Sequence, residues 1–340
     1  MKISARTPNR IDLAGGTLDI YPLYIFLEGG YTLNAAIDLF SQVDLSPRQD
    51  DQFYFESVDF GTELLVSRED LLAGRADNSD FRLLVQGVKA YLPAQGLNVR
   101  SFNQAPKGSG LGASSALLIA LSGALNQWNA TYADGNTLLQ RAADLEAWVL
   151  GIPTGKQDYY AALYGGLQAI HFDQSGVRRE HIAIPRETLA QINGGLVLSF
   201  TGESHFSGTN NWSMMKRFID NKGETRSSLA AIRETAQALY QALGAGDLAQ
   251  VYALLNQEWK NRQSLAAGVT TPQIDAMIAA ANGAGAQANK ICGAGGGGCL
   301  LTLCEPSDRD AVESALASTG AQIMHHQITS QGLQVNVLDD

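Results

Sequence analysis

Charged residues and proline are scarce in this chain of 340 residues, and long apolar runs are missing altogether. Asp, Glu, Lys and Arg make up only 17% of it, below the roughly 25% of an average soluble domain. The longest apolar stretches, such as 116–121 (ALLIAL), fall far short of the ~20 residues that a bilayer span needs. A hydrophobic fraction of 45% is nevertheless enough for a packed core. A disordered chain and a membrane-spanning helix are therefore excluded, and 9 prolines without a Gly-x-y period exclude a collagen-like fibre.

Basic residues, a secretory signal and paired cysteines are lacking as well. There are 24 Lys and Arg against 34 Asp and Glu, a net charge of −10, which argues against nucleic acid as a partner because phosphate backbones need a basic surface. The N-terminal MKISARTPNR has no apolar segment of the kind that signals secretion, so we expect a cytoplasmic protein. Three cysteines, Cys292, Cys299 and Cys304, show no metal-ligand spacing. We expect them to be reduced and mostly buried.

Glycine, by contrast, is abundant and unevenly placed. Of the 35 glycines, 14 fall in four segments that total 53 residues: 7–20, 106–116, 151–166 and 290–301. Even spreading would place about 5.5 there. Such clusters indicate backbone that adopts positive φ or approaches another group closely, often a ligand.

Hydrophobic periodicity predicts an α+β protein. Strands are expected at 2–7, 31–46, 97–103, 167–172 and 196–200, and helices at 114–130, 135–150, 157–163, 225–243, 247–264 and 272–282. The tail is expected to continue as strand, helix and strand, with Ser307 as the cap of its helix. We expect two domains, 1–190 and 191–340, without a linker that marks the boundary.

The strongest chemical signal is the segment 106–115 (PKGSGLGASS), between an expected strand and a buried helix. A glycine-rich turn there aims unpaired N–H groups and the positive end of the helix dipole at one point, which suits a phosphate. The P-loop pattern is not met, because no lysine follows the last glycine. A dinucleotide-binding pattern is met formally, by Gly108, Gly110 and Ala113 and again by Gly293, Gly295 and Gly298. It lacks the second strand that such folds place soon after the helix. A simple tight turn capped by serine is the structural alternative.

Three segments together resemble the motifs of the GHMP kinase superfamily. PKGSGLGASS is similar to its phosphate-binding motif P-x-G-x-G-L-G-S-S-A. Residues 7–20 (TPNRIDLAGGTLDI) resemble the N-terminal motif of the sugar kinase members, and 290–301 (KICGAGGGGCLL) resembles the glycine-rich third motif. AGG…D in the first motif and GKQDYYAALYGG at 155–166 are most similar to heptose 7-phosphate kinases and galactokinase-like anomeric sugar kinases.

The resemblance implies a fold and a reaction. The fold is α+β with two domains, an N-terminal mixed-sheet domain with the phosphate loop and a C-terminal ferredoxin-like α/β domain with added helices. The reaction is ATP- and Mg²⁺-dependent phosphorylation of a sugar hydroxyl, first of all the anomeric hydroxyl of a heptose 7-phosphate. Partners are then ATP and a small sugar or sugar phosphate, with no nucleic acid and no membrane, in a monomer or a homodimer. The alternatives are a galactokinase-type or mevalonate-like kinase, a catalytically silent regulator that binds sugar or nucleotide, and an NAD-dependent oxidoreductase.

The same resemblance implies the ATP and metal sites. The ATP-binding residues are Pro106, Lys107, Gly108, Ser109, Gly110, Leu111, Gly112, Ala113, Ser114 and Ser115. Ser115 and Glu146 are similar to the Mg²⁺ ligands of the superfamily, which fits the metal's demand for oxygen donors. The alternatives are that Ser114 and Ser115 only cap the helix and that Glu146 is a solvated side chain.

Two further residues resemble the catalytic pair. Asp158 is similar to the catalytic aspartate of the superfamily and is suited to accept the proton of a sugar hydroxyl, although an N-cap is its structural alternative. Arg10 matches an arginine near that aspartate and the transferring phosphate, work that suits a permanently charged planar donor. Lys156 either lowers the pKa of this base and touches the phosphate or is a surface lysine.

Substrate contacts are expected at Asp19, Gly16, Gly295 and Gly296. Galactokinases carry Gly-Glu-His before the aspartate, whereas this chain has smaller residues at 14–18 (AGGTL), which we interpret as more room beside the sugar. The polar segment 201–212 is expected to be a loop able to reach substrate, with His205 as a hydrogen-bonding residue. Candidates for a second phosphate site, or simply surface charges, are Arg6, Lys107, Arg178 and Arg179.

Overall fold

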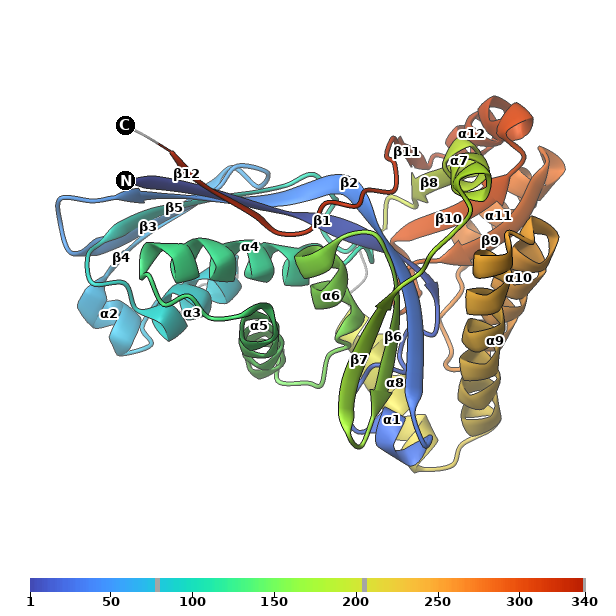
Figure 1. Cartoon of the computed structure of the whole chain (residues 1–340), viewed down its shortest axis with the longest axis horizontal. Coiled ribbons are helices and arrows are strands. Elements are labelled where there is room, and N and C mark those ends of the chain that lie inside the picture. The colour runs from blue at the N-terminus through green and yellow to red at the C-terminus, as the bar shows by residue number, and fades with distance from the viewer. Residues whose placement is uncertain (77–79, 204–206, 339–340) are drawn as a thin grey trace.

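The computed structural model describes residues 1–76, 80–203 and 207–338. Two β-sheets, each covered by helices, lie side by side along the longest axis (Figure 1). The first is an eight-stranded mixed sheet and the second a four-stranded antiparallel sheet. The expected α+β class, with a mixed sheet in the N-terminal part and an α/β arrangement in the C-terminal part, is confirmed.

The first sheet is built around two long strands. It contains β1 (Lys2–Ala14), β2 (Gly30–Pro47), β3 (Gln52–Ser57), β4 (Thr62–Ser67), β5 (Leu97–Asn103), β6 (Leu167–Asp173), β7 (Gly176–His181) and β12 (Gln334–Leu338). Its order is β12-β1-β2-β5-β3-β4, and β6 pairs with β2 and β7. The pairing of β3 with β5 is parallel, which makes the sheet mixed. Strand β2 pairs with β5 through its C-terminal half and with β6 through its N-terminal half.

Helices cover one side of this sheet (Figure 1). They are α2 (Arg68–Leu72), α3 (Arg82–Tyr91), α4 (Ala113–Trp128), α5 (Gly135–Leu150) and α6 (Gln157–Tyr164), while the short α1 (Leu23–Phe26) lies at the far end of β2. Helix α4 is buried from Ser115 to Leu125 because it packs between the strands β1 and β2 and the helices α3, α5 and α6. Its nearly all-round apolar sequence is what such a central helix requires.

The second sheet has the order β11-β8-β10-β9. Its strands are β8 (Leu196–Phe200), β9 (Ala286–Ile291), β10 (Cys299–Cys304) and β11 (Gln322–Met324). The helices of this half are α7 (Arg186–Gly195), α8 (Ser207–Ile219), α9 (Thr225–Ala245), α10 (Leu248–Gln263), α11 (Pro272–Gly283), the 3₁₀ turn η1 (Pro306–Asp308) and α12 (Arg309–Ser318). Strands β9 and β10 form a hairpin whose connection is the glycine-rich segment 292–298.

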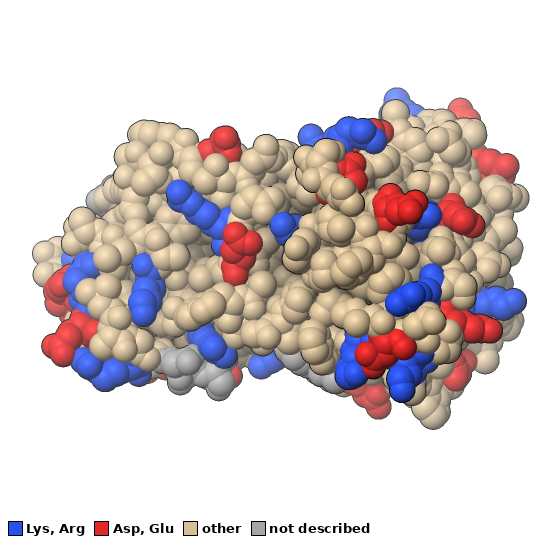
Figure 2. Space-filling model, turned by 90° about the horizontal axis from the view of Figure 1, so that it is seen from below, with Lys and Arg blue, Asp and Glu red and all other residues tan. Residues whose placement is uncertain are grey.

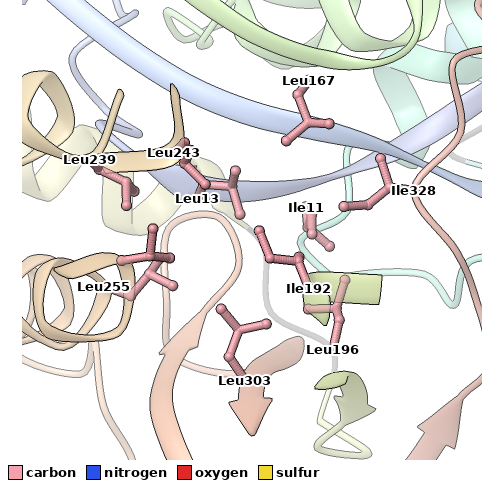
Figure 3. A pocket seen from close by; sticks show the side chains of 11 residues that line it. Ile11, Leu13, Leu167, Ile192, Leu196, Leu239, Leu243, Leu255, Leu303 and Ile328 are labelled. Carbon is pink, nitrogen blue, oxygen red and sulfur yellow. The ribbon is translucent and has the colours of Figure 1, made fainter. Parts of the chain in front are cut away.

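A continuous apolar core joins the two halves. It encloses a void of about 10 Å³, lined by side chains of β1, β6, α7, β8, α9, α10 and β10 together with Ile328 (Figure 3). Eleven aliphatic side chains line this void, so it lacks the polar partners that a buried water needs. The two sheets are thus held together by packing around β1, the strand that also carries Arg10.

The domain division near residue 190 remains a proposal. Residue 190 lies in α7, between the last hairpin of the first sheet and the first strand of the second. Strand β12, although it ends the chain, pairs with β1 and so returns to the first sheet. A division into 1–190 and 191–340 therefore assigns β12 by its position in the sequence and not by the sheet that it joins.

Most of the expected elements are confirmed, with corrections at helix starts and in loops. Ser307 does not cap α12, which begins after Asp308 without a side-chain cap. Residues 207–219 form α8, so only the start of 201–212 is a loop, and β3, β4, α2 and α3 were not predicted. Cys292, Cys299 and Cys304 are free and buried, as expected.

Charges of both signs are interspersed on the face shown in Figure 2, where no continuous basic track is visible. Among the helices that the structure describes, none combines the length and apolar character needed to cross a bilayer.

Candidate active site

Bulges in β1 set the direction of the first candidate residues. The pairing of β1 with β2 shifts register between Pro8 and Asn9 and again between Asp12 and Ala14. Bulges re-aim side chains along a strand. The short stretch between the two shifts carries Arg10 and Asp12, which are both buried.

Arg10 and Asp158 form an ion pair at the start of α6. The Nε and Nη2 atoms of Arg10 each lie 2.6 Å from Asp158 Oδ1. Burial raises the pKa of Asp158, and the charge and hydrogen bond of Arg10 partly offset this rise. The Asp158 side chain keeps 21% of its surface exposed, so a substrate can reach it. Lys156, not Asp158, occupies the N-cap position of α6, so the capping alternative for Asp158 is wrong.

The expected phosphate loop, 106–115, lies directly against this pair. Gly108, Gly110 and Gly112 all have positive φ, between 72° and 76°, which glycine adopts without steric cost. Arg10 donates through Nη1 to the Gly110 carbonyl and through its backbone N–H to the Leu111 carbonyl. A Cβ on Gly112 would lie 3.0 Å from the carboxyl carbon of Asp158. Loop, arginine and aspartate therefore converge.

Helix α4 starts without a side-chain cap. Its N-cap residue is Gly112, and no side chain accepts from its first N–H groups. The alternative in which Ser114 and Ser115 only cap this helix is therefore wrong. The leading N–H groups of an α-helix have no intrahelical partner, so this end of α4 is left with the donors that an anion requires.

Ser115 instead faces Glu146 of α5. Ser115 Oγ donates to Glu146 Oε2 at 2.8 Å, and the hydroxyl of Tyr159 donates to the same oxygen. Glu146 is only 5% exposed, so the alternative of a solvated side chain is wrong. Burial raises the pKa of Glu146, and the hydrogen bonds from Tyr159, Ser114 and Ser115 lower it in part.

Asp19 contacts the backbone of the residue that precedes Asp158. Its Oδ2 accepts from the backbone N–H of Gln157 at 2.9 Å. A Cβ on Gly155 would overlap the Asp19 carboxylate, so glycine is needed there for the two segments to meet. The pKa of Asp19 is raised to about 6, chiefly by burial; the hydrogen bond from the Gln157 N–H opposes this rise, and the carboxylates of Asp158 and Asp12 add to it.

The small residues before Asp19 do not open space for substrate. A Cβ on Gly15 would overlap the carbonyl oxygen of Tyr31, and one on Gly16 would lie 2.6 Å from Asp12 Oδ2. Our interpretation of 14–18 as room beside the sugar is wrong, because this chain's own backbone and carboxylate fill it. These glycines serve close packing in a fully buried turn.

The third glycine-rich segment packs against the phosphate loop. Gly110 approaches the Cys292 carbonyl so closely that a Cβ would lie 2.5 Å from it, and the N–H of Cys299 donates to Ser109 at 2.8 Å. At the tip, the Gly296 N–H donates to Val269 and the Gly295 carbonyl accepts from Asn210. These backbone groups are thus engaged within the chain. A substrate contact at Gly295 and Gly296 stays a proposal.

A buried ionic cluster beside the site was not expected from the sequence. It comprises Asp12, Glu258, Arg262 and Lys290, whose side chains are all 0% exposed. Lys290 Nζ lies 3.2 Å from Asp12 Oδ2, and Arg262 Nη2 lies 2.5 Å from Glu258 Oε1. Burial alone would raise the pKa of Asp12, but the cations Lys290, Arg262 and Arg10 lower it overall. The i,i+4 pair of Glu258 and Arg262 on an otherwise apolar helix face was the available signal.

The remaining candidates lie elsewhere. Lys156 Nζ donates to Gln140 on the surface, which supports the surface-lysine alternative. Arg6 pairs with Gln334, Arg178 with Glu180, and Arg179 and Lys107 lie over the rings of Tyr164 and Phe60. His205 lies outside the described residues.

Asp19 gives a test of this electrostatic arrangement through stability. Its pKa is about 6 against an ordinary 3.8, so the unfolded chain releases this proton first as pH rises. The contribution of Asp19 to stability is present below pH 3.8 and is lost as pH rises through 6. We expect the free energy of unfolding of Asp19→Asn, relative to wild type, to increase by about 1.5 kcal/mol between pH 5 and pH 7.5.

The measurement is urea unfolding at several pH values in that interval. Asp310→Asn, at an exposed aspartate of α12, is the control and should follow the wild-type curve. A constant difference between Asp19→Asn and wild type across the interval would contradict the raised pKa.

Two family models match the chain, GHMP kinases N terminal domain over residues 81–166 and GHMP kinases C terminal over residues 235–322. A D-glycero-alpha-D-manno-heptose 7-phosphate kinase from Campylobacter jejuni is 25% identical over 335 residues, 98% of each chain. A mevalonate kinase from Methanothermobacter thermautotrophicus is 30% identical over 230 residues, 67% of this chain and 71% of that protein. The crystal structure of a D-glycero-D-manno-heptose 1-phosphate kinase from Bacteroides thetaiotaomicron matches with a TM-score of 0.76 and 23% identity, covering 99% of this chain and all of that one.

A glycine-rich loop at the uncapped start of a buried helix, with an acidic side chain paired to arginine beside it, is an arrangement that suits a phosphotransferase. The chain belongs to the GHMP kinase superfamily. It is an ATP-dependent kinase that phosphorylates an alcohol. The dinucleotide alternative is therefore wrong, and α4 is indeed followed by another helix, α5, and not by a strand.

Proposed function

We propose that this kinase transfers the γ-phosphoryl group of ATP to a sugar hydroxyl, namely the anomeric hydroxyl of a heptose 7-phosphate or a related sugar. The observation that carries the proposal is the pairing of Arg10 with Asp158 at the phosphate loop. Asp19 lies close by, because it accepts from the backbone N–H of Gln157, the residue before Asp158. The heptose 7-phosphate kinase from Campylobacter jejuni, similar over 98% of both chains, supports the choice of substrate.

Asp158 acts as the base in this proposal. Its carboxylate is partly exposed, has a raised pKa and lies where the phosphate loop ends, so it is placed to accept the proton of the attacking hydroxyl. Arg10 holds the carboxylate and the loop together through three side-chain hydrogen-bond or ion-pair contacts. Its fixed positive charge also offsets the negative charge that develops on the transferring group.

Asp19 and the phosphate loop supply the two binding functions. In the proposal Asp19 contacts sugar hydroxyls, and residues 106–115 hold the phosphates of ATP through backbone N–H groups and the N-terminus of α4. Gly16 belongs to the same turn as Asp19, although it faces the buried Asp12 carboxylate.

Ser115 and Glu146 would hold Mg²⁺. The donor set is a hydroxyl and a carboxylate, 2.8 Å apart and nearly buried, and Mg²⁺ prefers one or two carboxylates completed by phosphate and water oxygens. The described residues contain no cluster of three or more His, Cys, Asp or Glu that would form an all-protein metal site. The residues therefore fit a metal that shares its shell with ATP. When bound, Mg²⁺ neutralises charge that develops on the phosphates.

Glu146→Gln tests this assignment. Because the amide removes the negative charge but keeps the shape, we expect the Mg²⁺ concentration for half-maximal activity to rise at least about tenfold. A Mg²⁺ titration at fixed ATP measures it, with Glu313→Gln on α12 as the control. Unchanged Mg²⁺ dependence in Glu146→Gln would remove Glu146 from the metal site.

The substrate is tested by a panel of sugars and sugar phosphates at fixed ATP and Mg²⁺, with ADP release as the readout. We expect D-glycero-D-manno-heptose 7-phosphate to give the highest kcat/KM. Phosphorus NMR of the product should show a new phosphate coupled to the anomeric proton. Higher turnover of galactose, or phosphorylation at a hydroxyl other than the anomeric one, would overturn the proposal.

Mevalonate is the second candidate acceptor. The observation that favours it is the 30% identity to a mevalonate kinase. This identity is higher than the 25% to the heptose 7-phosphate kinase, but it extends over 67% of the chain and not over 98%. Mevalonate belongs in the same panel, because it lacks an anomeric centre and its phosphorylation would give a different phosphorus spectrum.

A further inference from the structure

Arg262 is completely buried, yet it lies behind the turn that carries Asp19, the proposed contact of the phosphoryl acceptor. It belongs to α10 in the C-terminal half, and its side chain is 0% exposed. Its Nε and Nη2 atoms pair with Glu258 Oε1 one turn earlier, at 2.9 and 2.5 Å. The opposite edge of the guanidinium points across to the turn that follows β1.

That turn receives two hydrogen bonds from Arg262. Nη2 donates to the Gly16 carbonyl at 3.0 Å, and Nη1 donates to Thr17 Oγ1 at 3.5 Å. Thr17 has a φ of 79°, a conformation that β-branched residues rarely adopt and that the surroundings must enforce. Nη1 also donates to the Gly293 carbonyl at 3.5 Å, which joins the turn to the third glycine-rich segment.

The turn leads directly to the start of α6, the helix that carries Asp158. Backbone bonds from Leu18 to Gly15 and from Ile20 to Thr17 close it, so its position sets the position of Asp19. Asp19 in turn accepts from the N–H of Gln157, the residue before Asp158. A continuous path of hydrogen bonds and one tight turn thus runs from α10 to the start of α6.

The remaining charges of the cluster account for the burial of Arg262. Two carboxylates, Asp12 and Glu258, balance two cations, Arg262 and Lys290, within 3.9 Å of one another in successive pairs. Lys290 Nζ is engaged with the Asp12 carbonyl at 2.5 Å. Of the two cations, Arg262 is the one that contacts the turn. A planar guanidinium can donate to a carboxylate along one edge and to carbonyls along another.

We propose that Arg262 is a positioning residue for the phosphoryl acceptor: it fixes the turn 15–19 and thereby places Asp19, so the C-terminal half controls acceptor binding on the N-terminal half. The proposal rests on the proposed contact of Asp19 with the acceptor. It assigns Arg262 no contact with substrate. It implies that acceptor affinity, and not ATP affinity, depends on this side chain.

Arg262→Lys is the test variant. Lysine keeps the positive charge next to Glu258, but a single ammonium group cannot contact Glu258 and the turn at the same time. We expect the KM for D-glycero-D-manno-heptose 7-phosphate to rise by about tenfold to a hundredfold, with the KM for ATP within about twofold of wild type. Arg309→Lys is the matched control, since Arg309 also pairs with a glutamate four residues away and donates to two backbone carbonyls, away from this turn. It should leave both KM values unchanged.

Amide hydrogen exchange gives a readout that does not depend on the identity of the acceptor. In Arg262→Lys we expect faster exchange in peptides covering 15–20 and 156–158, with protection in β10 and α4 unchanged. Equal loss of protection throughout, or equal changes in both KM values, would mean a structural role only and would overturn the proposal. If the heptose phosphate is not turned over but exchange rises only in those peptides, the proposed substrate fails while the positioning role stands.

Discussion

Asp158→Asn is expected to lower kcat by about 10³-fold, within the range that removal of a general base produces. The amide is nearly isosteric and can still accept from Arg10, which contacts Asp158 Oδ1 at 2.6 Å. The amide cannot accept the proton of the attacking hydroxyl during phosphoryl transfer. The loop meets Asp158 by packing at Gly112. In the proposed function it holds ATP through backbone N–H groups, so the KM for ATP should stay within about twofold. Steady-state ADP release at saturating acceptor measures the loss.

Two further measurements make this outcome specific. Asp173→Asn, at an exposed aspartate that ends β6, should leave kcat unchanged. Binding of a non-hydrolysable ATP analogue to Asp158→Asn should match wild type, which separates loss of the proton acceptor from collapse of the loop. A kcat within tenfold of wild type would show that Asp158 is not the base and that the hydroxyl loses its proton by another route.

The fold was predictable from the sequence where burial left a simple pattern. Helix α4 is buried on all sides and begins at a glycine-rich turn, so 114–130 stands out as a long apolar run. Strand β4 was not predicted, because it lies at the edge of the sheet and its pattern is weak, with Leu65 exposed. Strand β3 was missed although it buries alternate residues, Phe53 and Phe55 among them. The return of β12 to β1 depends on a contact between residues more than 300 positions apart, which no local pattern encodes.

The candidate site shows the same division. The motifs predict Arg10 beside Asp158 and Ser115 beside Glu146, because glycine spacing and charge are visible within short segments, and the structure brings each pair together. The roles of these residues stay predictions. The motifs misjudged the helix start, where Gly112 and not a serine precedes α4. They also could not show that the space beside Gly16 is filled by the Asp12 carboxylate with Arg262 behind it, since Arg262 comes from a helix about 250 residues later. Neighbours across the two halves are set by packing.

Arg10→Gln is expected to lower kcat/KM by about 10²- to 10³-fold, the effect of removing one charged donor from a developing anion. It should also change the pH profile. Burial raises the pKa of Asp158 and Arg10 partly offsets that rise, so loss of the guanidinium leaves the burial effect unopposed and raises this pKa further. The base then stays protonated to higher pH, and the acid limb of the kcat/KM profile should move to higher pH than in wild type.

Arg10→Lys separates charge from geometry in the same experiment. Lysine keeps a cation near Asp158 but loses the fork that reaches both Asp158 and the Gly110 carbonyl, and one ammonium cannot replace that geometry. We therefore expect a clear loss of kcat/KM with a smaller shift of the acid limb than in Arg10→Gln. If the acid limb stays in place in both variants, the titrating group is not Asp158. Equal rate losses and equal shifts would instead mean that a cation without the fork geometry does nothing. A wild-type rate in Arg10→Lys would mean that charge alone accounts for Arg10, and that the contact with the Gly110 carbonyl contributes nothing to transfer.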